Sequence, residues 1–412
     1  MGRLIKLSKR LVASGAMLAG AGVLAQGLFT TPAHAAVPVT GPCSGLTNPV
    51  YISGSSAVKP VLQGLSQSIA ATTTLVYFSN GSCVGVQALL GTAQTATNGT
   101  YWVAPTVDNP TGETQCTLAA AQTIDVGVSD VYPTTCPGVT ADLVTTASMG
   151  DFHNFFAQVM EFVVPTGSDQ TAISAEAAYL TFGLGDDSAT PWNNKSLFAV
   201  RNNTSGTQAM LGKAIKLDAG KWLGTNAGSS GGVVTAIGTP TGDPKKTIGI
   251  LSSGEADPNT ATIKKLAFQG YDQTCAYWAD SGVSEKDKAY VRDGHYPVWG
   301  PLHVLAKVNA QGVATDPKAK ALIDLFAAQD KAIVDVEINA NVVPLCAMKV
   351  TRTAEMSPLM SSQPTGDCGC YFDSKRKTGG AGTECKVCTE ANAATVCTGA
   401  RTKCNYGYCE VK

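Results

Sequence analysis

The chain is poor in charged residues, in histidine and in long apolar runs. Charged residues make up 15% of its 412 residues, and 30 basic against 31 acidic side chains give a formal net charge of −1. This balance lacks the basic footprint of a nucleic-acid-binding protein. Beyond residue 35, no apolar run reaches the roughly 20 residues of a membrane span. With four histidines and no zinc-protease or calcium-loop motif, the sequence predicts neither a metal site nor a cofactor.

Residues 1–35 have the features of a signal peptide. Basic residues open the chain, no acid occurs up to residue 35, and an apolar stretch, Leu11–Phe29, leads to Ala33-His34-Ala35. Small residues at both alanine positions suit signal peptidase, so we expect cleavage after Ala35; the alternative is an uncleaved anchor. Cleavage removes four of the 30 basic residues and no acid, and 26 minus 31 gives a mature net charge of −5. We therefore expect a periplasmic, extracellular or cell-surface protein.

Cysteine is the one residue type whose use is unusually rich, with 13 in the chain. In an exported protein this number indicates disulfide bonds, and because it is odd, at least one thiol stays free or pairs between chains. Six are dispersed: Cys43, Cys83, Cys116, Cys136, Cys275 and Cys346. Seven crowd the end: Cys368, Cys370, Cys385, Cys388, Cys397, Cys404 and Cys409.

The clustered cysteines define a small module, residues 367–412, after a linker at 353–366. A segment of this size buries too little apolar surface to fold without covalent staples. Half a zinc site at Cys385–Cys388 is the alternative, but no histidine occurs in this segment, which favours disulfides. The connectivity, the role of the module and its target stay open at this point.

The body of the chain alternates strand-like and helix-like segments, which predicts an α/β fold. Strands are predicted at 75–78, 123–128, 162–164, 197–200 and 247–251. Helices are predicted at 58–69, at 84–90, through Met210 to Ile215, and at 318–334. We interpret the polar, Thr-rich stretch 91–123 as a surface excursion of the chain and not as a domain.

Four short segments place glycine and hydroxyl-bearing residues where a strand hands over to a helix, or end a strand in a carboxylate. A helix N-terminus offers free N–H groups and the positive end of a dipole, so it suits an anion. Alone, each segment is equally compatible with an ordinary cap or turn. The segments are Gly54-Ser-Ser-Ala57, Gly81-Ser-Cys-Val-Gly85, Ile124-Asp-Val-Gly-Val-Ser-Asp130 and Arg201-Asn-Asn-Thr-Ser-Gly-Thr207.

Taken in this order, the four segments resemble the high-affinity phosphate-binding proteins of bacterial ABC uptake systems. The family's Gly-Ala-Thr-Phe-Pro-Ala-Pro is similar to Gly54–Pro60, and its Tyr-Gln-Gly-x-Gly-Ser-Ser-Gly-Gly to Tyr77–Gly85. Its Asp-Phe-Gly-Ala-Ser-Asp is similar to Asp125–Asp130, and its Arg-x-Asp-x-Ser-Gly-Thr to Arg201–Thr207. The resemblance runs from about residue 51 to the helix near residue 326.

The resemblance implies the two-lobed type II periplasmic-binding-protein fold, with residues 36–160 and 297–352 in one lobe and 161–296 in the other. It implies a non-enzymatic protein that holds inorganic phosphate in the interlobe cleft and delivers it to an ABC permease. The implied phosphate-binding residues are Ser56, Ala57, Ser82, Asp130, Arg201, Ser205, Gly206 and Thr207. Asp130 would accept a hydrogen bond from protonated phosphate and repel sulfate, which carries no proton at neutral pH.

Three departures from the family leave other interpretations open. Asn203 stands where the family has an aspartate near the arginine, and Cys83 and Val84 add bulk to the second loop. One alternative is a surface interaction protein that keeps the fold and binds phosphate weakly or not at all. Another is a hydrolase in which Cys83, at the centre of Gly81-Ser-Cys-Val-Gly85, acts as nucleophile; such an enzyme needs a histidine base.

Overall fold

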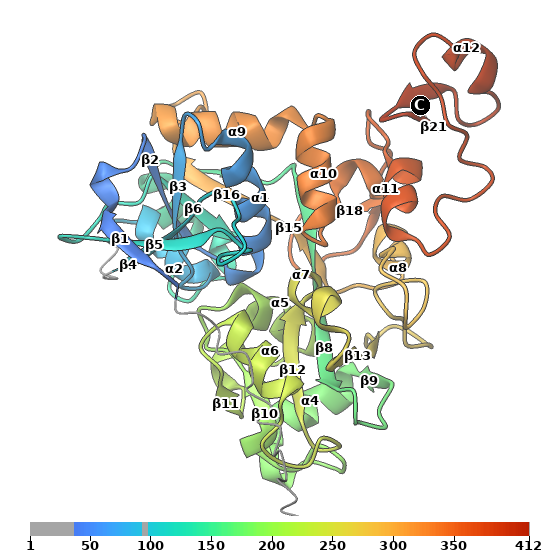
Figure 1. The fold of residues 1–412 in the computed structure, drawn as a ribbon. Helices are drawn as coiled ribbons and strands as arrows, with labels where there is room; N and C mark the ends of the chain where they lie inside the picture. Colours follow the sequence, from blue (N-terminus) through green and yellow to red (C-terminus); the bar gives the residue numbers. More distant parts are fainter. Residues whose placement is uncertain (1–36, 93–97, 412) are drawn as a thin grey trace, which may run out of the picture. The chain divides into compact units, whose positions relative to one another are not determined.

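The computed structural model describes residues 37–92 and 98–411, so the predicted signal peptide lies outside the described residues. Its core is a pair of β-sheets, each covered by helices (Figure 1). We call the sheet that contains β2, with its helices, the first lobe, and the sheet that contains β12, with its helices, the second lobe. Across the described part of the chain, no helix combines the length and apolar character required to cross a bilayer.

The first lobe is built around three parallel strands with β2 in the middle, and within the described residues its sheet has eight strands. In spatial order they are β1 (Val39–Pro42), β5 (Glu113–Thr117), β4 (Asn98–Trp102), β3 (Thr74–Phe78), β2 (Pro49–Gly54), β6 (Val126–Ser129), β16 (His303–Lys307) and β7 (Met149–Phe152). Alternate side chains of β2 and β3 enter different cores because successive residues of a strand face opposite sides. Tyr51 and Val76 pack with α2 (Ser82–Leu89), whereas Ile52 and Leu75 pack with α1 (Lys59–Ile69).

The second lobe repeats this layered design around β8 and β12. Its strands are β11 (Thr225–Asn226), β10 (Phe198–Val200), β12 (Ile248–Ser252), β8 (Phe156–Pro165) and β13 (Ile263–Lys265). On one face, Phe182 of α4 (Ala175–Leu184) packs against Phe162 and Phe198, and α5 (Gly206–Ile215) lies in the same core. On the other face, α6 (Ser230–Gly238) and α7 (Ser253–Ala256) cover a smaller core.

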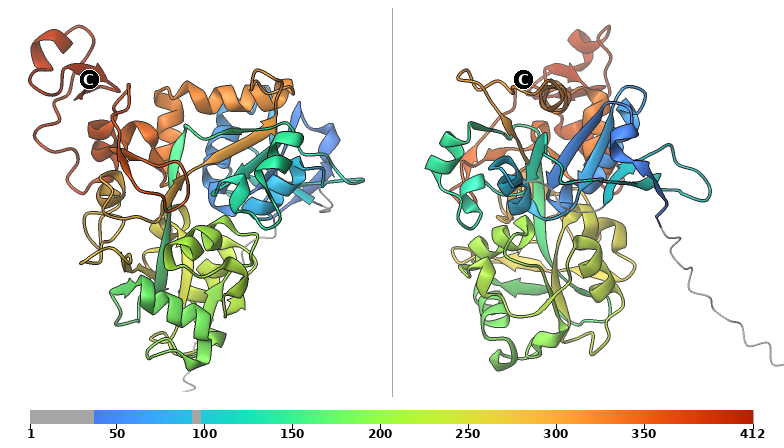
Figure 2. Two further views of the ribbon diagram at one scale, coloured as in Figure 1. Left: turned by 180° about the vertical axis from the view of Figure 1, so that it is seen from behind. Right: turned by 90° about the vertical axis from the view of Figure 1, so that its left-hand side faces the viewer.

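Two connections join the lobes. The chain leaves the first sheet after β7 and enters the second through β8, the longest strand, which is visible in both views of Figure 2. It returns through β15 (Trp299–Pro301), which pairs with β8, into β16, which lies antiparallel between β6 and β7. This strand order confirms the α/β class and the two-lobed type II architecture. The exact lobe boundaries stay a prediction.

The remaining elements decorate this frame. They include a small sheet of β9 (Ala172–Ser174) and β14 (Ala267–Gln269), the hairpin of β18 (Val350–Thr351) and β19 (Met360–Ser361), and the strand β17 (Val343–Pro344) beside β8. Short helices are α3 (Ala141–Thr146) and α8 (Ala289–Arg292). The segment predicted to be a linker therefore contains a hairpin strand.

Twelve of the 13 cysteines form six disulfides, and the remaining one, Cys275, is free and exposed. The pairs are Cys43–Cys116, Cys83–Cys136, Cys346–Cys368, Cys370–Cys385, Cys388–Cys404 and Cys397–Cys409. The expectation of disulfides, with an odd thiol left over, is confirmed. Both cysteines of the alternative half zinc site, Cys385 and Cys388, are consumed by disulfides.

The C-terminal module is stapled within itself and tied to the body. It holds α11 (Gly369–Arg376), α12 (Ala393–Val396) and a hairpin of β20 (Lys403–Asn405) and β21 (Tyr408–Glu410). Tyr371 of α11 donates to Asp335 of α10 (Lys331–Asn339), and the two helices lie side by side in Figures 1 and 2. The Cys346–Cys368 disulfide adds a covalent link to the body.

Two expectations from the sequence were wrong. The single helix predicted at 318–334 is two helices, α9 (Pro317–Ala328) and α10, because Gln329 adopts a left-handed conformation (φ 43°) and the Asp330 side chain caps a new helix. The stretch 91–123 is more than an excursion: β4 and β5 extend the first sheet by antiparallel pairing, and the Cys43–Cys116 disulfide ties β5 to the segment after β1.

Candidate functional site

The candidate site begins at the carboxyl ends of the three parallel strands β3, β2 and β6. Ser55 and Ser56 follow β2, Ser82 opens α2 after β3, and Asp130 follows β6. Ligands of open α/β sheets bind at such strand ends, because the loops that follow adjacent parallel strands meet there. All four side chains belong to buried residues, so the loops bring together polar groups that bulk water does not satisfy.

The Asp130 carboxylate is the centre of the first-lobe part. Its Oδ1 accepts from Ser55 Oγ at 2.5 Å and from Gln158 Nε2 of β8 at 2.6 Å, and its Oδ2 accepts from Ser82 Oγ at 3.2 Å. An ionised carboxylate has about four lone-pair positions. Three protein donors therefore leave capacity at Oδ2 for one further donor.

The surroundings of Asp130 change its affinity for a proton. Burial raises the pKa of Asp130, and the hydrogen bonds from Ser55 and Ser82, together with the nearby Arg201 guanidinium, oppose that rise. The net direction is upward from the ordinary value of an aspartate. The ionised carboxylate is therefore less stabilised in the folded protein than in water, and a donor from a ligand would stabilise it.

Arg201, at the end of β10, reaches from the second lobe to the first. Its Nη1 donates to Ser56 Oγ at 3.2 Å and to Ser230 Oγ at 3.3 Å, and the two hydroxyls lie 2.8 Å apart. The residue is 6% exposed, and its Nε is buried without a hydrogen-bond partner. Within the described residues Arg201 forms no ion pair; Asp130 and Glu255 are acidic groups close enough to raise its pKa against the lowering caused by burial. The site therefore holds a buried cation that lacks an anionic partner.

The N-terminus of α5 lies against Asp130 and Ser82. Ser205 is the N-cap, and its hydroxyl accepts from the Gln208 N–H at 3.4 Å. Helix geometry leaves the N–H groups of Gly206 and Thr207 without an acceptor inside the helix. A Cβ on Gly206 would lie 2.2 Å from Ser82 Oγ and 2.8 Å from Asp130 Oδ2. Only glycine permits this close approach, so the dipole of α5 is directed at the polar loops of the other lobe.

The fold brings the eight predicted phosphate-binding residues together, although the amide of one of them, Ala57, is already engaged. Ser56, Ser82, Asp130, Arg201 and Gly206 meet through the contacts just described, and Ser205 and Thr207 flank Gly206 in a buried position. Ala57 lies in the same loop, but its N–H donates to Ser55 Oγ at 3.1 Å and caps the turn there. In this conformation Ala57 supports the loop and its amide is already engaged.

Four residues of the site were not found from the sequence: Ser55, Gln158, Ser230 and Glu255. Ser230 opens α6 within Ser229-Ser-Gly-Gly232, a helix-start pattern of the same kind as the other segments, so a signal was present. Gln158 is a lone amide in the buried strand β8, and Glu255 lies on α7, where burial raises its pKa. Neither position carries a local pattern, because only the fold brings these side chains to Asp130 and Arg201.

The departures from the family pattern have structural outcomes. Cys83 forms a disulfide with Cys136, so it offers no thiolate, which removes the nucleophile that the hydrolase alternative requires. The disulfide joins the start of α2 to the segment after Asp130 and so holds two of the predicted loops together. Asn203 is exposed and lies outside the contacts of Arg201, which leaves the guanidinium without a countercharge from this loop.

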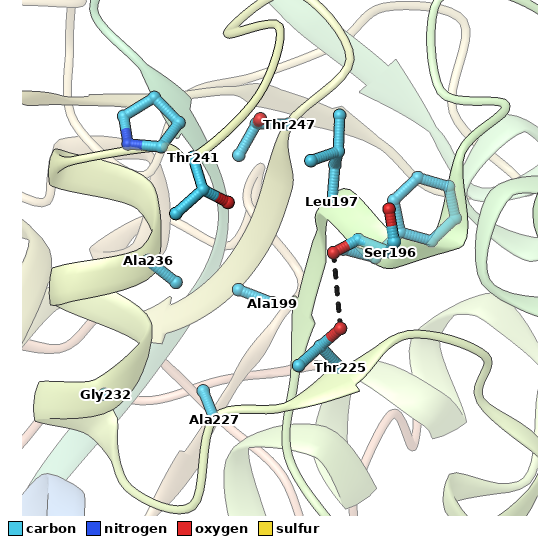
Figure 3. Close-up of a pocket in the computed structure, with 11 residues that line it drawn as sticks. Ser196, Leu197, Ala199, Thr225, Ala227, Gly232, Ala236, Thr241 and Thr247 are labelled. Atoms are coloured by element: carbon cyan, nitrogen blue, oxygen red, sulfur yellow. Dashed lines mark hydrogen bonds between the residues drawn. The ribbon is translucent and has the colours of Figure 1, made fainter.

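The cavity drawn in Figure 3 lies elsewhere in the second lobe. Its volume is about 190 Å³, and its walls come from β10, the segment around β11, and α6, including Leu197, Ala199 and Ala236. The Thr225 hydroxyl that faces it donates to the Ser196 carbonyl oxygen at 3.2 Å. None of the eight predicted phosphate-binding residues lines this cavity, and its largely aliphatic walls offer no cation to an anion.

Comparisons with known proteins were made on sequence and on structure. No protein-family model matches the chain, and no curated protein matches it. Among solved structures, it is similar to a Clostridium perfringens protein described as a phosphate ABC transporter substrate-binding protein with bound phosphate, at 12% identity and a TM-score of 0.49. That alignment covers 72% of this chain and 99% of the other.

Two further solved structures give the same picture. An ABC-type phosphate transport receptor from Vibrio cholerae is 15% identical, with a TM-score of 0.42, over 71% of this chain and 99% of that one. A DING protein is 13% identical, with a TM-score of 0.45, over 72% of this chain and 90% of that one. At these values the likeness carries no argument about function, so the inferences below rest on the residues of this chain.

Proposed function

We propose that the chain is an exported, non-enzymatic solute-binding protein that captures inorganic phosphate between its lobes. The ligand would be held by Ser56 and Ser82 from the first lobe and by Arg201 and the N-terminus of α5 from the second. Hydroxyl, amide N–H and guanidinium donors are the groups that bind tetrahedral oxyanions. The contacts of these groups with one another across the lobes support a single shared site.

The observation that carries the proposal is the unmatched charge of Arg201. A buried cation is costly unless a partner compensates it, yet in the described residues the contacts of this guanidinium are hydroxyls, and its Nε has no partner. A bound oxyanion would supply the missing charge and accept from Nη1 and Nε. The free N–H groups at the start of α5 would add further donors on the other side.

Asp130 gives the proposal its selectivity. A carboxylate beside an anion is repulsive unless the anion carries a proton that it can share. Protonated phosphate would donate to the open position at Oδ2, whereas sulfate at neutral pH has no proton to give. The three hydrogen bonds from Ser55, Ser82 and Gln158 would hold the carboxylate in position to accept a hydrogen bond from a protonated ligand.

Uptake by an ABC permease is the transport role that fits a two-lobed protein of this kind. Ligand groups come from both lobes, so phosphate would stabilise the arrangement in which the lobes meet. A permease that recognises this arrangement would receive the loaded protein and not the empty one. The target of the C-terminal module remains a separate question, because the module contributes no residue to the site described above.

The proposal is tested by calorimetric titration of the purified mature protein with phosphate, in the wild type and in Gly206→Ala. The added Cβ collides with Ser82 and with Cβ of Asp130, so we expect phosphate affinity to fall at least about tenfold. The matched control is Gly231→Ala, in the first turn of α6, where the nearest atom to the new Cβ is 3.8 Å away. No phosphate binding by the wild type, or equal affinity in Gly206→Ala, would contradict the proposal.

A further inference from the structure

We call the proposed phosphate site, formed by Ser56, Ser82, Asp130, Arg201 and the start of α5, the anion site. A second polar cluster, separate from the anion site, lies at the connections between the lobes. It consists of Asp151 at the end of β7, His153 just after it, and His303 at the start of β16. A carboxylate oxygen of Asp151 and one nitrogen of each histidine all lie within 4.8 Å of one another. The chain has four histidines in 412 residues, so the meeting of two of them with an acid is notable.

The distances in the cluster suit the coordination of a metal. His303 Nδ1 lies 2.8 Å from Asp151 Oδ1, and His153 Nδ1 lies 3.5 Å from the same oxygen. Ligands bound tetrahedrally to zinc at about 2.0–2.1 Å are about 3.3 Å apart. The two observed distances bracket this value, and all three donor atoms lie within 4.8 Å of one another, so side-chain shifts would place them around one ion.

The polar atoms of the cluster are incompletely satisfied. His153 Nδ1 is buried and has no hydrogen-bond partner, although it points toward the carboxylate. The Asp151 carboxylate faces one ring nitrogen of each histidine. An arrangement of one anionic oxygen and two imidazoles is a donor set that zinc and similar ions accept.

The cluster also has access to solvent on one side. The His303 side chain is completely buried, whereas that of His153 is 37% exposed. His153 lines a cavity of about 330 Å³ together with Tyr132 and Arg352, and the rings of Tyr132 and His303 pack with their centroids 4.2 Å apart. An ion could enter from this cavity, and a water molecule could complete a fourth coordination position.

We propose that Asp151, His153 and His303 form a binding site for a divalent transition-metal ion, for which Zn²⁺ is the best fit. Asp151 and His153 flank the connection into β8, and His303 follows the return connection through β15. The ion would therefore cross-link the two connections between the lobes. If the lobes close on a ligand, as the proposed function implies, these connections bend, and metal occupancy would stiffen the hinge.

The test is titration of the chelator-treated, metal-free mature protein with Zn²⁺ by calorimetry and with Co²⁺ by visible absorption. All variants carry Cys275→Ser, which removes the one free thiol as a competing ligand. We expect one site per chain with the absorption bands of tetrahedral Co²⁺ and no thiolate band. His153→Ala and Asp151→Asn should each weaken Zn²⁺ binding at least about tenfold.

The matched control is His295→Ala. His295 also pairs with an aspartate, at 2.7 Å from Asp293, but it is 51% exposed and belongs to no such cluster. Its loss should leave Zn²⁺ affinity unchanged. Absence of Zn²⁺ binding in the wild type, or unchanged affinity in either His153→Ala or Asp151→Asn, would overturn the proposal. Neither outcome would bear on phosphate binding, because no residue is shared with the anion site.

Discussion

Two buried groups of charged residues in this protein differ in whether each cation has a carboxylate as its direct partner. In the second lobe, Lys265 and Lys288 lie between Asp257 and Asp280, and all four side chains are at most 3% exposed. We call these four residues the lysine cluster. Lys265 lies 2.7 Å from Asp257, and Lys288 lies 2.7 Å from Asp257 and 2.8 Å from Asp280. Arg376 of the C-terminal module adds a contact with Asp257 at 3.1 Å. At the anion site, by contrast, Arg201 and Asp130 each bond to hydroxyls or an amide and not to each other.

The comparison separates structural charge from charge that is available to a ligand. In the lysine cluster every cation has a carboxylate, and the pKa of Asp257 is lowered to about 2 by Lys288 and Lys265 although burial raises it. The contact from Arg376 also joins the C-terminal module to this cluster. At the anion site the protein leaves one cation and one acceptor position unfilled. Burial of charges alone therefore does not mark a binding site, and the proposal for the anion site rests on the unmatched charge of Arg201 together with the hydroxyl and amide donors around it.

The largest effect should come from breaking the matched cluster. Asp280→Asn leaves Lys265 and Lys288 with one carboxylate fewer in a dry environment, so the free energy of unfolding should fall by about 3 kcal/mol. Asp130→Asn should change it by no more than about 1 kcal/mol, because burial already disfavours the charge there. Urea unfolding at neutral pH, with the disulfides intact, measures both. Equal losses of unfolding free energy in the two variants would contradict the distinction between the lysine cluster and the anion site.

A smaller effect should follow from pH. The pKa of Asp130 is raised in the folded protein, so this residue takes up its proton at a higher pH than in the unfolded chain. Its contribution to stability is present below the unfolded pKa and is lost as the pH rises through the folded pKa. Once protonated, Asp130 can donate to an anion and no longer repels sulfate.

We therefore expect sulfate affinity, measured by calorimetry, to increase several-fold as the pH falls from neutral through the raised pKa of Asp130. In Asp130→Asn this increase should be absent, because the amide does not titrate. An equal increase in both proteins would assign the pH dependence to another group.

The parts of the fold that were predictable from sequence are those with a strong local pattern. β3 and β12 are short apolar runs, and the loops of the anion site carry glycine and hydroxyl residues at strand ends. The strands β4 and β5 were missed because polar and threonine-rich sequence conceals a strand at the side of a sheet. The break at Gln329 was missed because a left-handed non-glycine residue gives no signal, although Asp330 is an ordinary N-cap.

The parts that could not be predicted depend on contacts between distant segments. Gln158 and Asp130 come from different strands, and the lysine cluster joins residues 257, 265, 280 and 288 with Arg376. Cysteine content predicts disulfides but not their partners, so the Cys346–Cys368 link between body and module was unforeseen. The Asp151, His153 and His303 cluster was missed for the same reason, since 150 residues separate its two histidines.

The central claim is that loops from both lobes bind one oxyanion, and that Asp130 favours an oxyanion with a proton to donate. Parallel calorimetric titrations with phosphate and with sulfate, on wild type and Asp130→Asn at neutral pH, test it directly. We predict that the wild type binds phosphate with little sulfate binding. In Asp130→Asn the ratio of phosphate affinity to sulfate affinity should fall at least about tenfold. Equal wild-type affinity for the two anions would contradict the claim.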